Sequence, residues 1–180
     1  TTPKPVNVYN GKILISPDYE QVCPFEVIAD STYDYYIYLK YQRLPENNYM
    51  SRALKDAAKN PYEKDIAFYV EAGKTVTIDV PIGVYKLYYA TGSTFFGTRL
   101  LFGDHTQFYS SDELLDFYTR ESGTKGYYST MGHTVTLKAI RNAKKQGAII
   151  IHNHPGWRRK TMDKSPEQEQ IYAEKLIDGI

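Results

Sequence analysis

The amino-acid sequence predicts a mainly β protein, an antiparallel β-sandwich with a helical insertion and a short α/β appendage at its C-terminal end. Three observations predict this architecture. Apolar and polar residues alternate along several short segments, and Gly and Pro separate those segments at short spacing. Seventeen of the 18 tyrosines lie before residue 140, where the residue pattern changes from strand-like to alternating helix and strand. We therefore predict a β-sandwich domain over residues 1–139 and an α/β fragment over residues 140–180.

Five segments of the first domain have the composition of strands. Residues 34–42, DYYIYLKYQ, form a dense aromatic and β-branched run, which suits a half-buried pleated surface. In residues 73–83, GKTVTIDVPIG, aliphatic and polar residues alternate until a Pro and a Gly end the strand. Residues 84–92, VYKLYYATG, begin the next strand after a tight turn. Residues 97–104, GTRLLFGD, and 132–139, GHTVTLKA, are further strand candidates.

Two segments of the first domain depart from this pattern. Within NNYMSRALKDAAKNPYEKD, residues 47–65, the composition predicts a helix over residues 51–59 that Asn60 and Pro61 stop. This segment is a predicted helical insertion between two strands. Residues 111–118, SDELLDFY, are interpreted as one helical turn or a loop.

The end of the chain predicts alternating helix and strand. KAIRNAKKQG, residues 138–147, has apolar residues at helical spacing and a C-terminal Gly. AIIIH, residues 148–152, predicts a short buried strand of the kind found in parallel sheets. Ser165 begins a capping box with Pro at the first helical position, which predicts a helix to about Lys175. LIDGI then begins another strand, so the tail is interpreted as an α/β layer cut off in mid-unit.

Composition excludes several classes of partner. The formal charge of +1 and the pI near 7.7 give no field that would recruit nucleic acid or an anionic membrane. No apolar run approaches the roughly 18–20 residues that span a bilayer. The single cysteine, Cys23, excludes an internal disulfide, and its sequence surroundings predict a buried, unreactive thiol.

His152 and His154 are the strongest metal-ligand candidates. They lie two residues apart, so on a strand they share one face and can share a metal ion. The alternative is a pair of solvent-exposed histidines at a strand end. A catalytic zinc needs three protein ligands and an open position. The sequence offers as further candidates Asp163, Glu167, Glu169, His105 and His133.

Three other chemical readings have weaker support. A JAMM-type isopeptidase motif begins as HNHP does, but Ser165 comes too late and Gln168 stands at the aspartate position, where an amide supplies no carboxylate. A basic run over residues 158–160 suits a phosphate or, equally, a solvated loop. Asp104, His105 and Ser111 suggest a triad, yet the sequence has no nucleophile elbow.

The tyrosines of the first domain offer a binding surface. Aromatic side chains on strands form faces for sugars or peptides, or else bury the ring and expose the hydroxyl. Both interpretations apply to Tyr35, Tyr36, Tyr38, Tyr41, Tyr88 and Tyr89.

The tail resembles a segment of the PHP (polymerase and histidinol phosphatase) family, metal-dependent phosphoesterases built on a distorted β/α barrel. The matching residues, within about 136–180, are AKKQGAIIIHNHPGW and SPEQEQIYAEKLIDGI. The resemblance implies that His154 is a ligand of a Zn, Mn or Fe cluster, and it assigns no ligand role to His152. The family also needs an opening His-x-His, a Glu, further His and a closing Asp-x-His, which nothing upstream of residue 136 supplies.

Residues 1–139 resemble small bacterial immunoglobulin-like β-sandwich domains of undefined role. The resemblance rests on YYIYLKY, on FYVEAGKTVTIDVPIGVYKLYYATG and on LFGDHTQFYSSDELLDF. It implies an envelope-associated or secreted protein, and its motifs imply turns and core rather than catalysis. Residues 132–143 fit a last sandwich strand in this resemblance and a helix in the other.

We therefore expect a non-catalytic accessory or interaction domain of a bacterial envelope-associated or secreted protein, with no catalytic residues and no cofactor. The partner is an unidentified protein or glycan. Homo-oligomers through the apolar strand Ile149–Ile151 are a further hypothesis. The location is extracytoplasmic, or alternatively cytoplasmic. The alternative function is a divalent-metal phosphoesterase of PHP type, present only as a fragment, with Zn, Mn or Fe held by His154.

Overall fold

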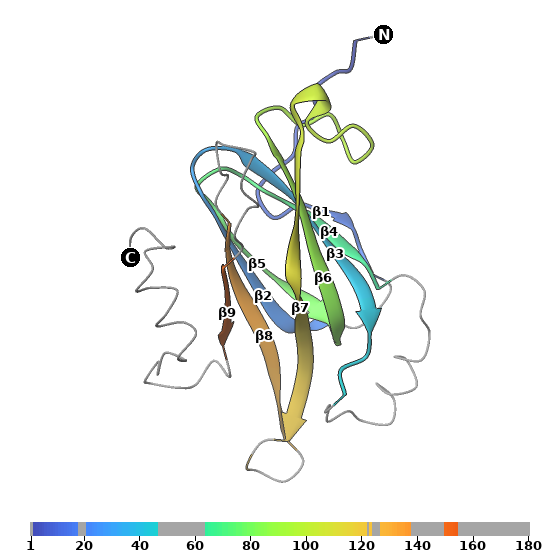
Figure 1. Ribbon diagram of the computed structural model, residues 1–180, viewed down its shortest axis with the longest axis vertical. Coiled ribbons are helices and arrows are strands. Elements are labelled where there is room, and N and C mark those ends of the chain that lie inside the picture. The colour runs from blue at the N-terminus through green and yellow to red at the C-terminus, as the bar shows by residue number, and fades with distance from the viewer. Residues whose placement is uncertain are drawn as a thin grey trace.

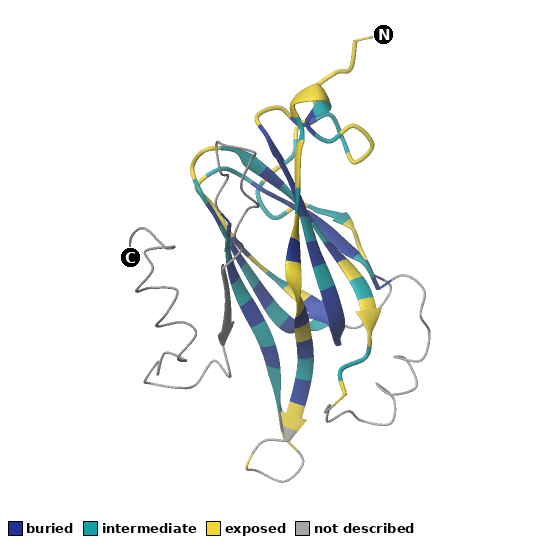
Figure 2. Cartoon of the chain, viewed as in Figure 1, coloured by how far each residue is buried: buried dark blue, intermediate teal, exposed yellow. Residues whose placement is uncertain are grey.

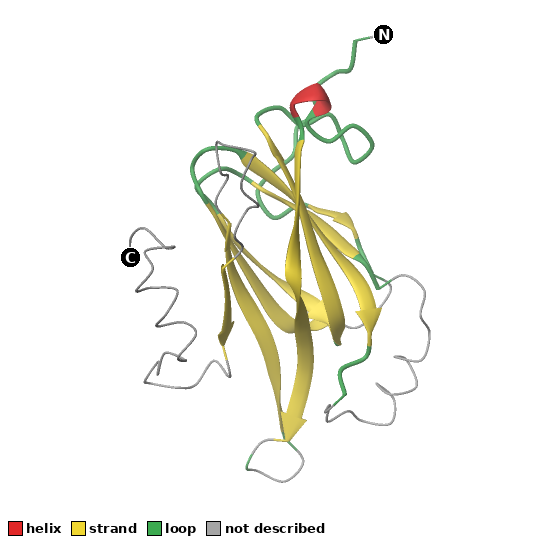
Figure 3. Cartoon of the chain, viewed as in Figure 1, coloured by secondary structure: helices red, strands yellow, loops and turns green. Residues whose placement is uncertain are grey.

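The described part of the chain is mainly β, as predicted. The computed structural model describes residues 2–17, 21–46, 64–121, 123, 127–137 and 150–154. These residues form nine strands and a short 3-10 helix, η1, which is drawn in red in Figure 3. The elements are β1 (Ile13–Ile15), β2 (Gln21–Ala29), β3 (Asp34–Arg43), β4 (Ile66–Val70), β5 (Thr75–Pro81), β6 (Gly83–Gly92), η1 (Gly103–His105), β7 (Gln107–Glu121), β8 (Tyr128–Leu137) and β9 (Ile150–His154).

The strands form one mixed sheet that curls on itself (Figure 1). Its order is β1-β4-β3-β6-β7-β8-β2-β5, and β9 pairs with β8 beside this path. Strand β7 joins the two halves of the sheet: residues 107–117 pair with β6 and residues 118–121 pair with β8. Strands β2 and β8 run parallel, and the other pairs are antiparallel.

The core lies between the two halves of the sheet. Buried and less buried residues alternate along β2, β3 and β8, so each strand presents one apolar face inward (Figure 2). Phe25 of β2 has no exposed surface, and its ring lies 6.1 Å from that of Phe68 and 5.6 Å from that of Phe117. These two rings come from β4 and from the β6-paired part of β7. The aromatic contacts therefore join one half of the sheet to the other.

Three aspartates accept hydrogen bonds from tyrosine hydroxyls near the ends of strands. The Tyr69 hydroxyl donates to Asp34 over 2.6 Å, and the Tyr35 hydroxyl donates to Asp30 over 2.9 Å. The third pair is Tyr38 and Asp65. Each of these carboxylates also accepts a backbone N–H. Tyrosine can thus bury its ring while its hydroxyl is satisfied.

We expect these buried tyrosines to make the protein unfold cooperatively in alkali. Burial raises the pKa of Tyr35, Tyr69, Tyr85 and Tyr89, and nearby carboxylates or phenols add to the shift. The folded state thus holds these protons more tightly than the unfolded chain, where tyrosine titrates near pH 10. Their contribution to stability is complete below about pH 10 and is lost as the pH rises above it, by about 1.4 kcal/mol per pH unit for each tyrosine kept protonated.

The measurement is an alkaline titration that follows tyrosinate absorbance and far-ultraviolet circular dichroism together. The tyrosinate absorbance of the buried tyrosines and the circular dichroism of the sheet should change together, in one transition above pH 10. Full ionisation while the β signal persists would show that the hydroxyls are not held in the core.

Two segments differ from their predicted structure. Residues 111–118 belong to strand β7, so the predicted helical turn or loop is wrong. A bulge explains the error: Lys86 pairs with Leu114 and Tyr88 with Ser110, so β7 uses four residues where β6 uses two. The predicted strand over residues 97–104 is also wrong, because this segment forms turns and η1 with positive φ angles at Gly97, Leu101 and Gly103.

The predicted strand over residues 148–152 is confirmed for residues 150–152, which belong to β9, but its predicted setting in a parallel sheet is wrong. Strand β9 pairs antiparallel with β8, and the two strands lie side by side in Figure 1. It occupies the edge of β8 beyond the point where β7 leaves for the other half of the sheet. The predicted helices at 51–59, 138–147 and 165–175 lie outside the described residues, and the boundary near residue 139 stays a prediction.

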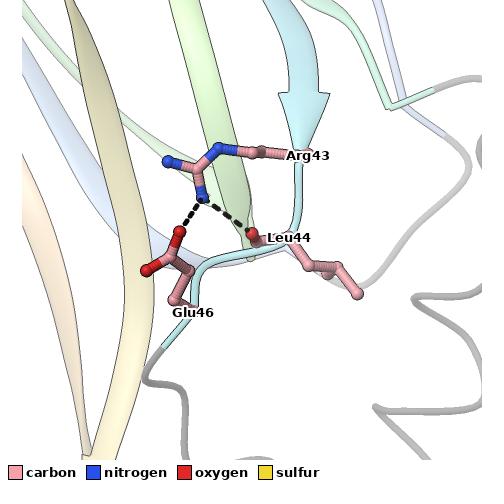
Figure 4. Close-up of polar contacts among 3 residues, drawn as sticks. All are labelled: Arg43, Leu44 and Glu46. Carbon is pink, nitrogen blue, oxygen red and sulfur yellow. Dashed lines mark hydrogen bonds and ion pairs between the residues drawn. The ribbon is translucent and has the colours of Figure 1, made fainter.

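Strand β3 ends in an exposed polar turn. The Arg43 guanidinium donates to the Leu44 carbonyl over 3.3 Å and lies 3.8 Å from the Glu46 carboxylate (Figure 4). The side chains of Arg43 and Glu46 are 51% and 84% exposed. Because solvent screens such a pair, it contributes little to stability.

Candidate binding site, an aromatic groove

The structure separates the six candidate tyrosines into two groups. Tyr35, Tyr85 and Tyr89 have their rings in the core between the sheet halves, and Tyr41 packs against the edge of that core. Tyr36, Tyr38 and Tyr88 are the half-buried residues in alternate positions of β3 and β6. Their rings lie on the outer face of the sheet. The structural interpretation is therefore confirmed for the core tyrosines, and the binding interpretation stays a prediction for Tyr36, Tyr38 and Tyr88.

A groove of about 660 Å³ opens on this outer face. Four outward aromatic residues, Tyr36, Tyr38, Tyr88 and Phe108, line it, and Lys40 supplies the one charge of the lining. Tyr89 and Tyr109 also border it, although their rings pack with the core. Its lining residues are Tyr36, Tyr38, Lys40, Tyr88, Tyr89, Ala90, Leu101, Phe108, Tyr109 and Ser110. We call this surface the aromatic groove.

Because of the sheet register, the outward residues of the aromatic groove lie in rows across the strands. Cross-strand neighbours of β3, β6 and β7 form one row of Tyr36, Ala90 and Phe108 and a second row of Tyr38, Tyr88 and Ser110. The rings of Tyr38 and Tyr88 lie 6.4 Å apart. Phe108 is 71% exposed, so a large apolar ring faces solvent at one edge of the aromatic groove. Such exposed apolar surface is typical of binding sites.

A second, smaller core forms one wall of the aromatic groove. Phe95 and Phe102 from the β6–β7 connection pack on Tyr69 and Ala90, on the outer face of the sheet. A Cβ on Gly92 would lie 2.3 Å from the Phe102 side chain, so this close approach requires glycine. Leu101 follows in the left-handed region, with a φ of +50°, and lines the aromatic groove. The backbone strain at Leu101 is therefore stored next to the candidate site.

Polar groups of the aromatic groove gather around Tyr38 and Lys40. The Tyr38 hydroxyl donates to Asp65 over 2.5 Å, and burial followed by this bond raises the pKa of Tyr38. The phenol stays protonated at neutral pH, and its oxygen remains an acceptor for a ligand. Lys40 pairs across the sheet with Lys86 on the same face, and the Lys86 ammonium lies 5.5 Å from the centre of the Tyr88 ring.

Sequence reasoning found the tyrosines of this site and missed Phe108, Leu101 and the two lysines. The alternation in DYYIYLK places Lys40 on the face of Tyr36 and Tyr38, and that signal was available. No pattern in the sequence indicated that Leu101 would line the site, because residues 97–104 were predicted as a strand.

The candidate metal ligands His152 and His154 lie on β9, where their Cα atoms pair with those of Thr134 and Gly132. In the described part of the chain, no group of three or more His, Cys, Asp or Glu residues is placed to hold a metal ion. The exposed His105 lies in η1, and the buried His133 has its Nε2 2.7 Å from the Asp116 carbonyl oxygen. The other predicted candidates, Asp163, Ser165, Glu167, Gln168, Glu169 and residues 158–160, lie outside the described residues.

The remaining nucleophile candidates are engaged in the fold. Ser111 is buried in the β7 bulge, where its hydroxyl donates to the Glu113 carbonyl over 2.7 Å. Cys23 is fully buried, and its thiol lies 3.7 Å from the Tyr118 carbonyl oxygen. Burial, opposed by a backbone hydrogen bond from Met131, raises the pKa of Cys23 to about 12.

We expect the Cys23 thiol to be unreactive in the native protein. At neutral pH almost no thiolate is present, and the side chain is inaccessible. The native protein should react with a disulfide reagent such as DTNB at least about a hundredfold more slowly than the urea-unfolded protein. Equal rates in the two states would mean that Cys23 is not in the core.

In comparisons with known proteins, no family model, no curated protein and no solved structure matches this chain. Among the described residues, no helix is both long and apolar enough to cross a membrane. The resemblances to immunoglobulin-like domains and to the PHP family accordingly remain predictions.

Proposed function

We propose that this chain is a non-catalytic interaction domain of a bacterial envelope-associated or secreted protein, and that its aromatic groove binds the partner. The observation that carries this proposal is the group of outward aromatic side chains in the aromatic groove, Tyr36, Tyr38, Tyr88 and Phe108, of which Phe108 is 71% exposed. The exposed part of this ring contributes no hydrophobic stabilisation to the folded chain. A partner that covers the ring removes it from water, and this burial stabilises the complex.

The fold in this proposal is an immunoglobulin-like β-sandwich over residues 1–139, with a helical insertion and an α/β appendage. The contacts of Phe25 with Phe68 and Phe117 support it, because they join two sheet halves over one core. A sandwich of this kind supplies a rigid platform. Residues on its outer face keep their spacing whether or not a ligand is present, which suits a binding module.

The test is co-sedimentation of the purified protein with bacterial envelope preparations, which contain both surface proteins and surface glycans. Phe108→Ala should reduce the bound fraction at least about threefold, since it removes the most exposed ring of the aromatic groove. Lys74→Ala, in an exposed position of the β4–β5 turn, is the matched control and should bind as the wild type does. Equal binding by Phe108→Ala would contradict the aromatic groove as the binding surface.

The proposal also predicts how metal analysis will separate it from the alternative, a PHP-type phosphoesterase that holds Zn, Mn or Fe with His154 as one ligand. His152, on the same strand, is a further candidate ligand. Elemental analysis of the purified protein should find none of these metals in stoichiometric amount. His154→Ala should leave the melting temperature unchanged, since no metal is lost. Stoichiometric metal that His154→Ala releases, with loss of phosphomonoesterase activity, would favour the alternative.

A further inference from the structure

The geometry points to an acidic glycan as the ligand of the aromatic groove. We propose that sugar rings stack on Tyr38, Tyr88 and Phe108 while a sugar carboxylate binds between Lys40 and Lys86. This inference rests on the proposed function and adds the class of ligand. Three features carry it: Lys40 of the aromatic groove lies opposite Lys86 beside it, aromatic side chains lie on the same face, and the strands below the two lysines are paired on both sides.

Lys40 and Lys86 are like charges in directly opposed positions. They are Cα partners across β3 and β6 and lie on the outer face of the sheet. Like charges placed in this way repel each other and destabilise a sheet. Within the described part of the chain, neither lysine forms an ion pair. An anion that bound between the two ammonium groups would relieve their repulsion and accept hydrogen bonds from both.

The aromatic rows adjoin this lysine pair. Along β3 and β6 the lysine row is followed by Tyr38 with Tyr88 and then by Tyr36 with Phe108 across the sheet. Successive rows are about 7 Å apart, because they lie two residues along each strand. The face of an aromatic ring carries a partial negative charge and attracts the C–H groups on the face of a sugar ring. A chain of sugars can therefore stack on the tyrosine and phenylalanine rings and place its acidic group at the lysines.

The backbone of β3 and β6, below the lysine pair, favours a glycan over a peptide. Strand β3 is paired on both sides, with β4 and β6, and β6 is paired on both sides, with β3 and β7. A peptide that binds a sheet uses free backbone groups at an edge. These central strands have none to offer. Among the described residues, β7 pairs only with β6 over residues 107–117, so its other edge is open, but a peptide paired there would extend the sheet and would not lie over Lys40 and Lys86. The outer face of β3 and β6 presents rings, a tyrosine hydroxyl and two ammonium groups instead. Those groups match the apolar faces, hydroxyls and carboxylates of an acidic sugar.

The experiment measures binding of the folded, full-length chain by isothermal titration calorimetry. The probes are short oligomers of three acidic sugars: a galacturonate, a guluronate and a hyaluronan oligomer. The methyl-esterified galacturonate oligomer has the same rings without charge, and a poly-glutamate peptide has the charge without sugar. We expect at least one acidic oligomer to bind roughly tenfold more tightly than its methyl ester and than poly-glutamate. Lys40→Gln with Lys86→Gln should remove that preference, and Phe108→Ala should weaken binding of both forms.

Controls separate binding from folding. Lys40 and Phe108 are exposed and Lys86 is half-buried, so none of these substitutions should lower the melting temperature. The double lysine variant should melt at the wild-type temperature or slightly above it, because it removes the repulsion. Lys74→Gln removes a lysine at the β4–β5 turn and should change no affinity. Equal binding of acid and methyl ester would overturn the acidic-glycan inference and leave the proposed function standing. Tighter binding of poly-glutamate would overturn it in favour of an acidic peptide. If every probe fails while envelopes still bind in a Phe108-dependent way, the ligand class is wrong and the function stands.

Discussion

Replacing Phe25 by alanine is expected to lower the free energy of unfolding by about 3–5 kcal/mol. The Phe25 ring is fully buried and contacts both Phe68 of β4 and Phe117 of β7 edge to face. Its removal takes away buried apolar area, leaves a cavity and deletes two aromatic contacts between the halves of the sheet. Urea unfolding followed by circular dichroism measures the change, with the slope of the transition unchanged if the folded state keeps its shape.

Phe108→Ala is the matched control for this experiment. It removes the same side chain from β7 on the outer face, where the ring is 71% exposed, and should change stability by less than about 0.5 kcal/mol. A loss at Phe25 no larger than the loss at Phe108 would show that the sheet halves do not share one core around Phe25.

Gly132→Ala is expected to destabilise the fold by about 3 kcal/mol or more. A Cβ at Gly132 would lie 1.8 Å from the carbonyl oxygen of Pro24, a backbone atom of β2 that no rotamer change can move. Gly132 lies in β8 just before the parallel pairing with β2 begins, at Phe25 with His133. The added methyl group therefore separates two strands at the start of their pairing, and both are needed to close the sheet around its core.

Thermal unfolding of Gly132→Ala beside Gly123→Ala measures this effect. A Cβ on Gly123 meets nothing within 4 Å, so the same substitution there should be neutral or slightly stabilising. If the two variants have the same melting temperature, β2 and β8 do not approach as closely at Pro24 as the structure places them.

The sequence was most informative where one residue pattern had one structural meaning. Alternation in DYYIYLKYQ, GKTVTIDVPIG and GHTVTLKA predicted strands, and β3, β5 and β8 confirm them. Alternation failed in SDELLDFY, because the β7 bulge inserts residues whose side chains break the period of two. It failed again in GTRLLFGD, where Leu101 adopts a left-handed φ that is rare for leucine and that no local pattern indicates.

The tail shows a different limit. Three isoleucines before His152 suit a buried strand, and β9 confirms a strand that includes Ile150 and Ile151. Its antiparallel partner, β8, is a strand of the predicted sandwich, and a run of apolar residues does not specify the direction of a neighbour.

The candidate site was predictable in part. Composition identified the tyrosines as a possible binding face, and the period of two could have separated Tyr36, Tyr38 and Tyr88 from the inward Tyr35 and Tyr89. The order of strands in the sheet could not be predicted in this way. Lys40 meets Lys86, and Phe108 joins the tyrosines, only because β6 lies between β3 and β7. Such juxtapositions are set by long-range pairing and not by local sequence.

The most direct test of the binding account is a nuclear magnetic resonance titration of protein labelled at its aromatic rings, with the acidic sugar oligomers as ligand. The account predicts shifts at Tyr36, Tyr38, Tyr88 and Phe108 and little change at the inward rings of Tyr35, Tyr85 and Phe117. Shifts centred on any other surface, with the rings of the aromatic groove unaffected, would contradict it.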